Sequence, residues 1–213
     1  MGPNRNAVTR LMQYKNALDR LKSMGFQRVF SDNLADGVGV TASQVRRDFV
    51  SFGFSGNRRG GYNIDELTRK IHELLGKDRD QRVVIAGMGN IGQALTNYKQ
   101  FLKDGIRIVA GFDQDPRKQN ALGEIPVYPI EQLPEYAREH DIRIGIISVP
   151  EQAAQKVLDL MLTSPIKGVL NFSPIRLQAH RECLVHNVDI GQEIGTVIYY
   201  VNARNRQVNH EKE

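Results

Sequence analysis

Three glycines near the middle of the chain have the spacing of a turn that holds a pyrophosphate. Gly87, Gly89 and Gly92 follow the mostly apolar run Arg82–Ala86, typical of a buried strand, and lead into a predicted helix over Ile91–Leu102. The first glycine permits the tight bend, the second lets the backbone approach the pyrophosphate, and the third lets helix and strand pack closely. The anion would also meet N–H groups at the start of the helix. The sequence therefore predicts a dinucleotide cradle formed by Gly87, Met88, Gly89, Asn90, Ile91 and Gly92.

An acidic residue stands where such a site needs one for the adenosine ribose. The predicted strand Ile106–Phe112 ends in Asp113, 21 residues after Gly92. A carboxylate there can accept hydrogen bonds from the ribose hydroxyls and would repel a 2′-phosphate, so NAD is favoured over NADP. Arg117 leaves some room for a 2′-phosphate, and a loop acid that begins an Asp-x-Asp-Pro turn is the alternative role for Asp113.

These residues need a parallel sheet to position them, and the second half of the chain has the alternating pattern of one. Helices are predicted over Glu131–Glu139 and Glu151–Leu162, and strands over Ile142–Ser148, Gly168–Phe172 and Cys183–Asp189. Ligands of open parallel sheets bind at the carboxyl ends of the strands, so we expect the nicotinamide end of the site to be lined by Ser148, Val149 and Pro150. A plain strand-to-helix turn is compatible with the same three residues.

The first part of the chain carries the whole basic excess. Residues 1–82 hold 15 Lys and Arg against 9 Asp and Glu, whereas residues 83–213 hold 14 against 15. This asymmetry favours a polyanion-binding module joined to a neutral one, with a basic surface that serves solubility as the alternative.

The first part has the pattern of a winged helix-turn-helix. Helices are predicted over Thr9–Met24 and Asp32–Asp36, and Thr41 with Gln44 forms a capping box that opens a third helix. A basic, glycine-rich hairpin tip precedes a fourth helix. Arginines on the third helix can reach guanine in the major groove, and arginines on the tip can reach phosphates or a narrow minor groove. The candidate DNA contacts are Ser43, Gln44, Arg46, Arg47, Arg58 and Arg59; a solvated helix face is the alternative for the Arg46–Arg47 pair.

The last predicted helix has more apolar surface than a solvent-facing helix needs. Its apolar residues are Ile190, Ile194, Val197, Ile198 and Val201. Two explanations remain open: the helix packs on its own domain, or it docks on a second subunit.

The sequence offers little for catalysis. About forty residues follow Phe172, too few for a separate catalytic domain, and the five histidines have no metal-binding spacing. The single cysteine, Cys183, excludes an internal disulfide and a Cys-based zinc site. We therefore expect no catalytic residue, no metal and no enzyme activity. The absence of a long apolar run and of a signal peptide favours a cytoplasmic protein with no membrane contact. A nucleotide sensor that binds DNA is the preferred interpretation, with a small NAD-dependent reductase carrying a basic N-terminal domain as the alternative.

Seven stretches of the chain, taken together, resemble the Rex family of redox-sensing transcriptional repressors. They are VTASQVRRDFVSFG, RRGGY, GMGNIGQALTNY, GFDQDP, ISVPEQAAQ, NFSPIRL and VDIGQEI. The resemblance implies an α/β chain with a winged helix-turn-helix domain (1–80), a doubly wound Rossmann-type parallel sheet that binds NAD and NADH (81–188), and a C-terminal helix exchanged within a homodimer (189–213). It also implies binding to an inverted-repeat operator, double-stranded DNA from which NADH releases the protein.

The resemblance also implies roles for individual residues. Arg46 and Arg47 correspond to major-groove readers, Arg58 to a minor-groove contact and Arg10 to a phosphate contact. Tyr98 corresponds to a tyrosine that links to an aspartate on the exchanged helix, here Asp189. The chain departs from the family pattern in two places: Arg59 stands where many members have glycine, and Ile190 and Gly191 follow Asp189 without the aromatic residue that some relatives have near there.

Overall fold

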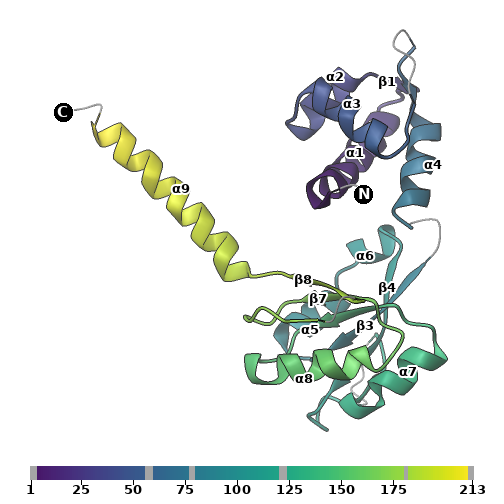
Figure 1. Ribbon diagram of the computed structural model, residues 1–213, viewed down its shortest axis with the longest axis vertical. Helices are drawn as coiled ribbons and strands as arrows, with labels where there is room; N and C mark the ends of the chain where they lie inside the picture. Colours follow the sequence, from purple (N-terminus) through teal and green to yellow (C-terminus); the bar gives the residue numbers. More distant parts are fainter. Residues whose placement is uncertain (1–3, 56–59, 77–79, 120–123, 180–181, 211–213) are drawn as a thin grey trace. The chain divides into compact units, whose positions relative to one another are not determined.

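The computed structural model describes residues 4–55, 60–76, 80–119, 124–179 and 182–210, without the side chains of residues 205–210 (Figure 1). Contacts divide the chain into two compact units, Met1–Arg79 and Asp80–Glu213. Each unit has its own hydrophobic core, so the two are described separately.

The first unit is a small helical domain. Its helices are α1 (Arg5–Ser23), α2 (Ser31–Val38), α3 (Ala42–Ser51) and α4 (Ile64–Leu74). Leu11, Tyr14 and Leu18 of α1 pack with Val45 and Phe49 of α3 in its core, which confirms the predicted apolar faces. Helix α1 begins earlier than its apolar pattern indicated, because the side chain of Asn4 accepts a hydrogen bond from the N–H of Ala7 and caps the helix there.

Helices α2 and α3 form the predicted helix-turn-helix. Thr41 caps α3, since its hydroxyl accepts a hydrogen bond from the N–H of Gln44 at 3.1 Å. The reciprocal half of the predicted capping box is wrong. The amide of Gln44 donates instead to Asp48, one turn further along α3.

A two-stranded antiparallel sheet joins the ends of this motif. Strand β1 (Arg28–Val29), which precedes α2, pairs with β2 (Tyr62–Asn63), which leads into α4. The predicted hairpin tip lies between α3 and β2. Its two arginines, Arg58 and Arg59, lie outside the described residues.

The second unit is built on a six-stranded parallel sheet. Its strands, in spatial order, are β5 (Val127–Pro129), β4 (Ile106–Asp113), β3 (Gln81–Ala86), β6 (Ile144–Ile147), β7 (Gly168–Asn171) and β8 (Leu184–Asn187). Counted from the first strand of the unit, this is the order 3-2-1-4-5-6 of a dinucleotide-binding Rossmann fold. The predicted Rossmann-type parallel sheet is confirmed.

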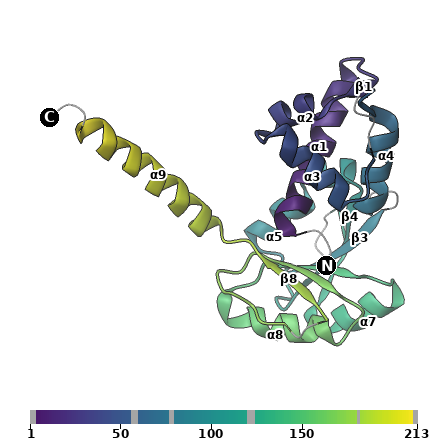
Figure 2. The ribbon, with the colours of Figure 1, turned by 45° about the horizontal axis from the view of Figure 1, so that its top comes forward.

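Helices cover both faces of this sheet. Val84 and Ala86 of β3 pack in one core layer with α7 (Leu133–Glu139) and α8 (Glu151–Leu162), which run along one face in Figure 2. Val83 and Ile85, which point the other way, pack with residues next to and within α5 (Asn90–Thr96) and α6 (Gln100–Lys103). The near-continuous apolar composition of β3 follows from this burial on both sides.

Two predicted elements differ from the structure. The single helix predicted over Ile91–Leu102 is divided into α5 and α6, because α5 ends at Thr96 and is followed by Asn97, a residue type that favours helix ends over helix interiors. The predicted helix over Glu131–Glu139 begins as a 3-10 turn at Ile130–Gln132 before α7. Strand β5 was not predicted, since three residues are too few to display a periodic pattern.

The chain continues from β8 into a long helix, α9 (Ile190–His210). Its large apolar side chains are exposed wherever they are described, from 51% at Ile190 to 68% at Tyr199. The parent domain therefore does not cover the apolar surface of this helix.

Candidate nucleotide site and nucleic-acid interface

A cavity of about 680 Å³ lies at the carboxyl ends of the central strands of the sheet. It spans the junction between β3 and β6, where the strand order reverses, which is the usual ligand position in such folds. Eight of the residues predicted from the sequence line it: Gly87, Gly89, Asn90, Ile91, Asp113, Ser148, Val149 and Pro150.

A different feature of the structure explains why glycine stands at each of the three positions of the loop. Gly87 has a φ of +96°, and a Cβ there would lie 2.6 Å from the carbonyl oxygen of Ser148. A Cβ on Gly92 would collide with the carbonyl oxygen of Gly87. Gly89 has an ordinary φ of −79° and faces open space within the cavity. The fold therefore requires Gly87 and Gly92, whereas the space at Gly89 is needed only by a ligand.

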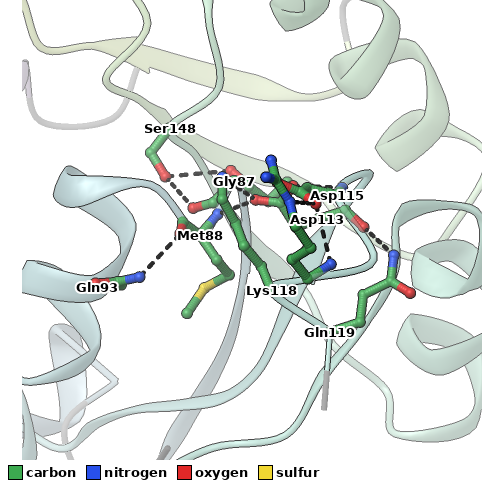
Figure 3. A network of polar contacts seen from close by, with 10 residues as sticks. Gly87, Met88, Gln93, Asp113, Asp115, Lys118, Gln119 and Ser148 are labelled. Carbon is green, nitrogen blue, oxygen red and sulfur yellow. Dashed lines mark hydrogen bonds and ion pairs between the residues drawn. The ribbon is translucent and has the colours of Figure 1, made fainter. Parts of the chain in front are cut away.

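Asp113 ties the glycine loop to the end of β4 (Figure 3). Its buried carboxylate accepts hydrogen bonds from the backbone N–H of Met88 at 2.7 Å and of Asp115 at 2.9 Å, and it pairs with the ammonium of Lys118 at 3.2 Å. A carboxylate has about four acceptor positions, so one remains for a ribose hydroxyl. Asp113 thus holds the loop in addition to facing the cavity.

Two of the predicted cradle residues do not line the cavity. The Met88 side chain is buried in the core layer on the α5 side of the sheet, and Gly92 is buried between the loop and Ser148. Both contribute through the backbone. The hydroxyl of Ser148 donates to the carbonyl oxygen of Gly87 at 2.8 Å, which joins the end of β6 to the same loop.

Two lysines on the cavity wall were missed by the sequence analysis. Lys118 lies in the turn that follows Asp113. Lys156 lies on α8, on the same face of the helix as Ala153, Val157 and Leu160. The available signal was a basic residue six positions after Pro150, on the helix that leaves the sheet. The two lysines are matched in number by two carboxylates of the same lining, Asp113 and Asp115, and most of the other lining residues are apolar.

Arg117, which left room for a 2′-phosphate, is paired with Asp115, a residue of the cavity wall. Its guanidinium pairs with that carboxylate at 2.8 Å, and hydrogen bonds from Arg117 lower the pKa of Asp115 to about 2. The loop, the acid at the strand end and the apolar wall fit an adenine dinucleotide: Asn90 and Ile91 line the cavity, and their N–H groups, in the first turn of α5, have no acceptors inside the helix. Within the described ranges, no group of three or more His, Cys, Asp or Glu side chains is placed to hold a metal ion.

The exposed face of α3 carries the predicted DNA contacts. Ser43, Arg46, Arg47 and Val50 are exposed, and Gln44 is half-buried. Arg47 donates to the amide oxygen of Gln44 at 2.7 Å. An exposed, basic helix face of this kind has the chemistry to read base edges in the major groove.

Arg10 lies in an ion pair rather than on an open face. Its Nε and Nη2 donate to the carboxylate of Asp48 at 2.6 and 2.7 Å, and its side chain is 21% exposed. Burial by itself raises the pKa of Asp48, but the hydrogen bonds from Arg10, Tyr14 and Gln44 outweigh it and hold that pKa below its ordinary value. The phosphate contact implied for Arg10 stays a prediction.

Tyr98 and Asp189 are both exposed. Tyr98 lies between α5 and α6 with its ring edge-on to Phe101, at 5.0 Å between centroids. Asp189 caps α9 by accepting a hydrogen bond from the N–H of Gln192 at 2.9 Å. The contacts described within this one chain do not join the two side chains.

The fold and the two sites define a class: a helix-turn-helix DNA-binding regulator with its own dinucleotide-binding domain. The redox-sensing transcriptional repressor Rex of Clostridium perfringens (strain SM101 / Type A) is 38% identical over 196 residues, 92% of each chain, and that of Desulforamulus reducens is 39% identical over 188 residues, 88% of this chain and 90% of the relative. The chain belongs to the Rex family of redox-sensing transcriptional repressors.

Other comparisons agree with this assignment. The model of the CoA binding domain matches residues 78–175, and that of the putative DNA-binding protein N-terminus matches residues 4–49. A crystal structure of RSP in complex with β-NAD⁺ and operator DNA has a TM-score of 0.90 at 32% identity and covers 100% of this chain and 99% of its own. RSP in complex with β-NADH has a TM-score of 0.85 at 32% identity, with 97% and 98% covered. The members of the family are repressors and not enzymes, so the reductase alternative is not favoured.

Proposed function

We propose that two copies of this protein bind an inverted-repeat operator and that NADH binding releases them, so that transcription follows the NADH/NAD ratio. The observation that carries the proposal is the cavity at the β3–β6 junction, open at Gly89, in a chain whose α3 exposes Arg46 and Arg47. Similar proteins support it, since RSP has been crystallised with β-NAD⁺ and operator DNA and with β-NADH.

The mechanism is a linkage between two binding equilibria. NADH binds preferentially to a closed dimer whose DNA-binding domains cannot span both half-sites, so NADH and operator weaken each other by the same coupling free energy. A ligand with equal affinity for both states shifts nothing, so NAD competes for the site without driving closure. NAD and NADH differ at the nicotinamide ring, which in NAD carries one positive charge and is planar. This difference is what the site must distinguish. In this chain the loop at Gly87–Gly92 and Asp113 hold the dinucleotide, and Ser148, Val149 and Pro150 line its nicotinamide end.

We further propose that α9 is the dimerisation element. Its exposed aliphatic residues lie on one side of the helix at spacings of three and four positions (Ile190, Ile194, Val197, Ile198 and Val201), and such a stripe is stabilised when a second subunit covers it. In this arrangement residues 189–213 form a segment exchanged between partners, after a DNA-binding domain over 1–80 and a nucleotide domain over 81–188. Tyr98 would then meet Asp189 of the second copy.

Within the described part of the chain, no helix is long and apolar enough to cross a membrane. We propose that the protein acts in the cytoplasm, where its operator lies.

On the operator, Ser43, Gln44, Arg46 and Arg47 are proposed to face the major groove. Arg58 and Arg59 are proposed to contact the minor groove or phosphates next to it; for Arg10, the phosphate contact that the resemblance implies competes with the ion pair to Asp48. Because phosphate contacts carry no sequence information, recognition of the operator depends on α3.

The deciding experiment is fluorescence anisotropy of a labelled inverted-repeat duplex with the full-length protein. NADH is expected to displace the protein and NAD to do so weakly or not at all; an assay of NADH oxidation with common keto acids runs beside it and is expected to show no turnover. If neither nucleotide changes the binding of the duplex, or if NADH is oxidised, the repressor proposal is contradicted and a reductase with a basic N-terminal domain is favoured.

The double change Ile194→Glu and Ile198→Glu is expected to convert the dimer to a monomer, since both charges enter the apolar stripe of α9. Analytical ultracentrifugation measures the mass, and operator affinity is expected to fall because two half-sites can no longer be bound together. The matched control places the same two charges at Gln192 and Thr196, on the opposite face of the helix. A dimeric Ile194→Glu, Ile198→Glu protein would remove α9 from the interface.

A further inference from the structure

Asp48 is a buried carboxylate on the inner side of the helix that carries the candidate DNA contacts. It is 3% exposed and accepts hydrogen bonds from Arg10 Nε and Nη2, from Tyr14 Oη at 2.8 Å and from Gln44 Nε2 at 2.8 Å. These four donors fill the acceptor positions of a carboxylate. Arg10 and Tyr14 stand one turn apart on α1, so the carboxylate ties α3 to α1 at one position along both helices.

The orientation of the Gln44 amide follows from this carboxylate. An ionised carboxylate only accepts hydrogen bonds, so the Gln44 NH₂ group must face Asp48 and its oxygen must face the other way. That oxygen accepts from Nη2 of Arg47 at 2.7 Å, and Nη1 of Arg47 lies 3.4 Å from the hydroxyl of Ser43. The buried ion pair is thereby connected to an exposed arginine through one amide.

Arg47 keeps most of its hydrogen-bonding capacity in this arrangement. A guanidinium has five N–H donors, of which Gln44 takes one at short range, so a pair of donors remains for the two acceptors of a guanine. An arginine held in one orientation before binding loses less conformational freedom when it meets the base.

We propose that Asp48 and Gln44 are positioning residues that orient Arg47 for base recognition, and that Arg10 acts by holding Asp48 rather than by contacting a phosphate. The inference rests on the proposed function, because it requires α3 to meet DNA. It assigns to Gln44 and Arg10 roles different from direct contact with the operator.

A double-mutant cycle separates positioning from contact. Gln44→Met keeps the length of the side chain and removes both amide groups; it is expected to weaken operator binding about 10-fold, part of the roughly 5- to 150-fold that a bidentate arginine–guanine contact contributes. In an Arg47→Ala background the same change is expected to have less than about a twofold effect, since the residue on which it acts is gone. Equal effects of Gln44→Met in both backgrounds would show that Gln44 contacts the operator itself.

The salt dependence of binding separates the two roles of Arg10. A lost phosphate contact lowers the slope of log K against log salt concentration by about 0.9 per site. Arg10→Met is expected to lower operator affinity with that slope unchanged; a slope lowered by about 0.9 per site would overturn the positioning role. Lys22→Met, which removes a charge from the exposed pair with Asp65, is the matched control on α1. Tyr14→Phe, which keeps the ring against Phe49 and removes one donor to Asp48, replaces Arg10→Met if that variant does not fold.

A measurement without DNA tests whether Asp48 and Gln44 orient Arg47, separately from the proposed function. Relaxation of the Arg47 Nε–H signal in the full-length protein is expected to show an ordered guanidinium that becomes mobile in Gln44→Met and in Asp48→Asn, whereas Asp65→Asn leaves it unchanged. A mobile Arg47 in the unmodified protein would contradict the inference even if the operator is bound. An ordered Arg47 in a protein that does not bind the operator would contradict the proposed function alone.

Discussion

Arg46→Ala is expected to abolish sequence-specific operator binding while NADH still binds. Arg46 is exposed on α3, outside the contacts that hold this helix to α1, so its loss removes a base reader without disturbing the domain. A bidentate arginine–guanine contact contributes about 1–3 kcal/mol of discrimination, and two copies in a dimer would double this to about 2–6 kcal/mol. The expected loss of specific affinity is on the order of 30-fold to 10⁴-fold.

Anisotropy with the operator and with an unrelated duplex of equal length measures this effect. Specific binding is expected to approach the non-specific level, and NADH titration of the variant gives the unmodified affinity. Arg69→Ala is the control, because it removes an exposed positive charge from α4, where Arg69 pairs with Glu73. If Arg46→Ala keeps its preference for the operator, Arg46 does not belong to the reading face.

Gly89→Val is expected to weaken NADH binding and leave a repressor that stays on its operator at NADH concentrations that release the unmodified protein. The backbone at Gly89 has dihedral angles that valine can adopt, and its Cβ would point into open space, so the fold tolerates the change. That space is the part of the cavity where the pyrophosphate must approach the backbone. Overpacking of this kind costs about 1–3 kcal/mol, which corresponds to roughly 5- to 150-fold in affinity.

Isothermal titration with NADH and operator anisotropy with added NADH measure the two halves of this prediction. Gly168→Val at the start of β7, where the nearest atom to a Cβ lies 4.0 Å away, controls for the introduction of a branched side chain into the same domain. Asp113→Ala is a less informative variant, since it also leaves the Met88 N–H without its acceptor and loosens the loop. A Gly89→Val protein that NADH still releases from DNA would move the pyrophosphate site elsewhere.

Local patterns were sufficient to predict the nucleotide domain. Three features of the sequence predicted it: the spacing of the glycines, the strand before them and the acid after the next strand. All three lie close together in the chain, and the backbone geometry of a single β-α-β unit sets each of them. The predicted order of strands and helices is confirmed, and eight of the predicted site residues line the cavity. The failures occurred at short elements: β5 and the break between α5 and α6 depend on a few residues each.

The sequence by itself determined the two-module organisation, the alternation of strands and helices in the nucleotide domain and the basic, exposed face of α3, because each of these follows from periodicity and spacing along one segment. Only the tertiary structure decided that Arg10 pairs with Asp48, 38 residues away, and that Lys118 and Lys156 line the same cavity while the Met88 side chain is buried in the core on the α5 side of the sheet. These outcomes depend on which helix packs against which and at what register. A side chain's partner is then set by contacts between segments distant in the chain, which no local pattern encodes.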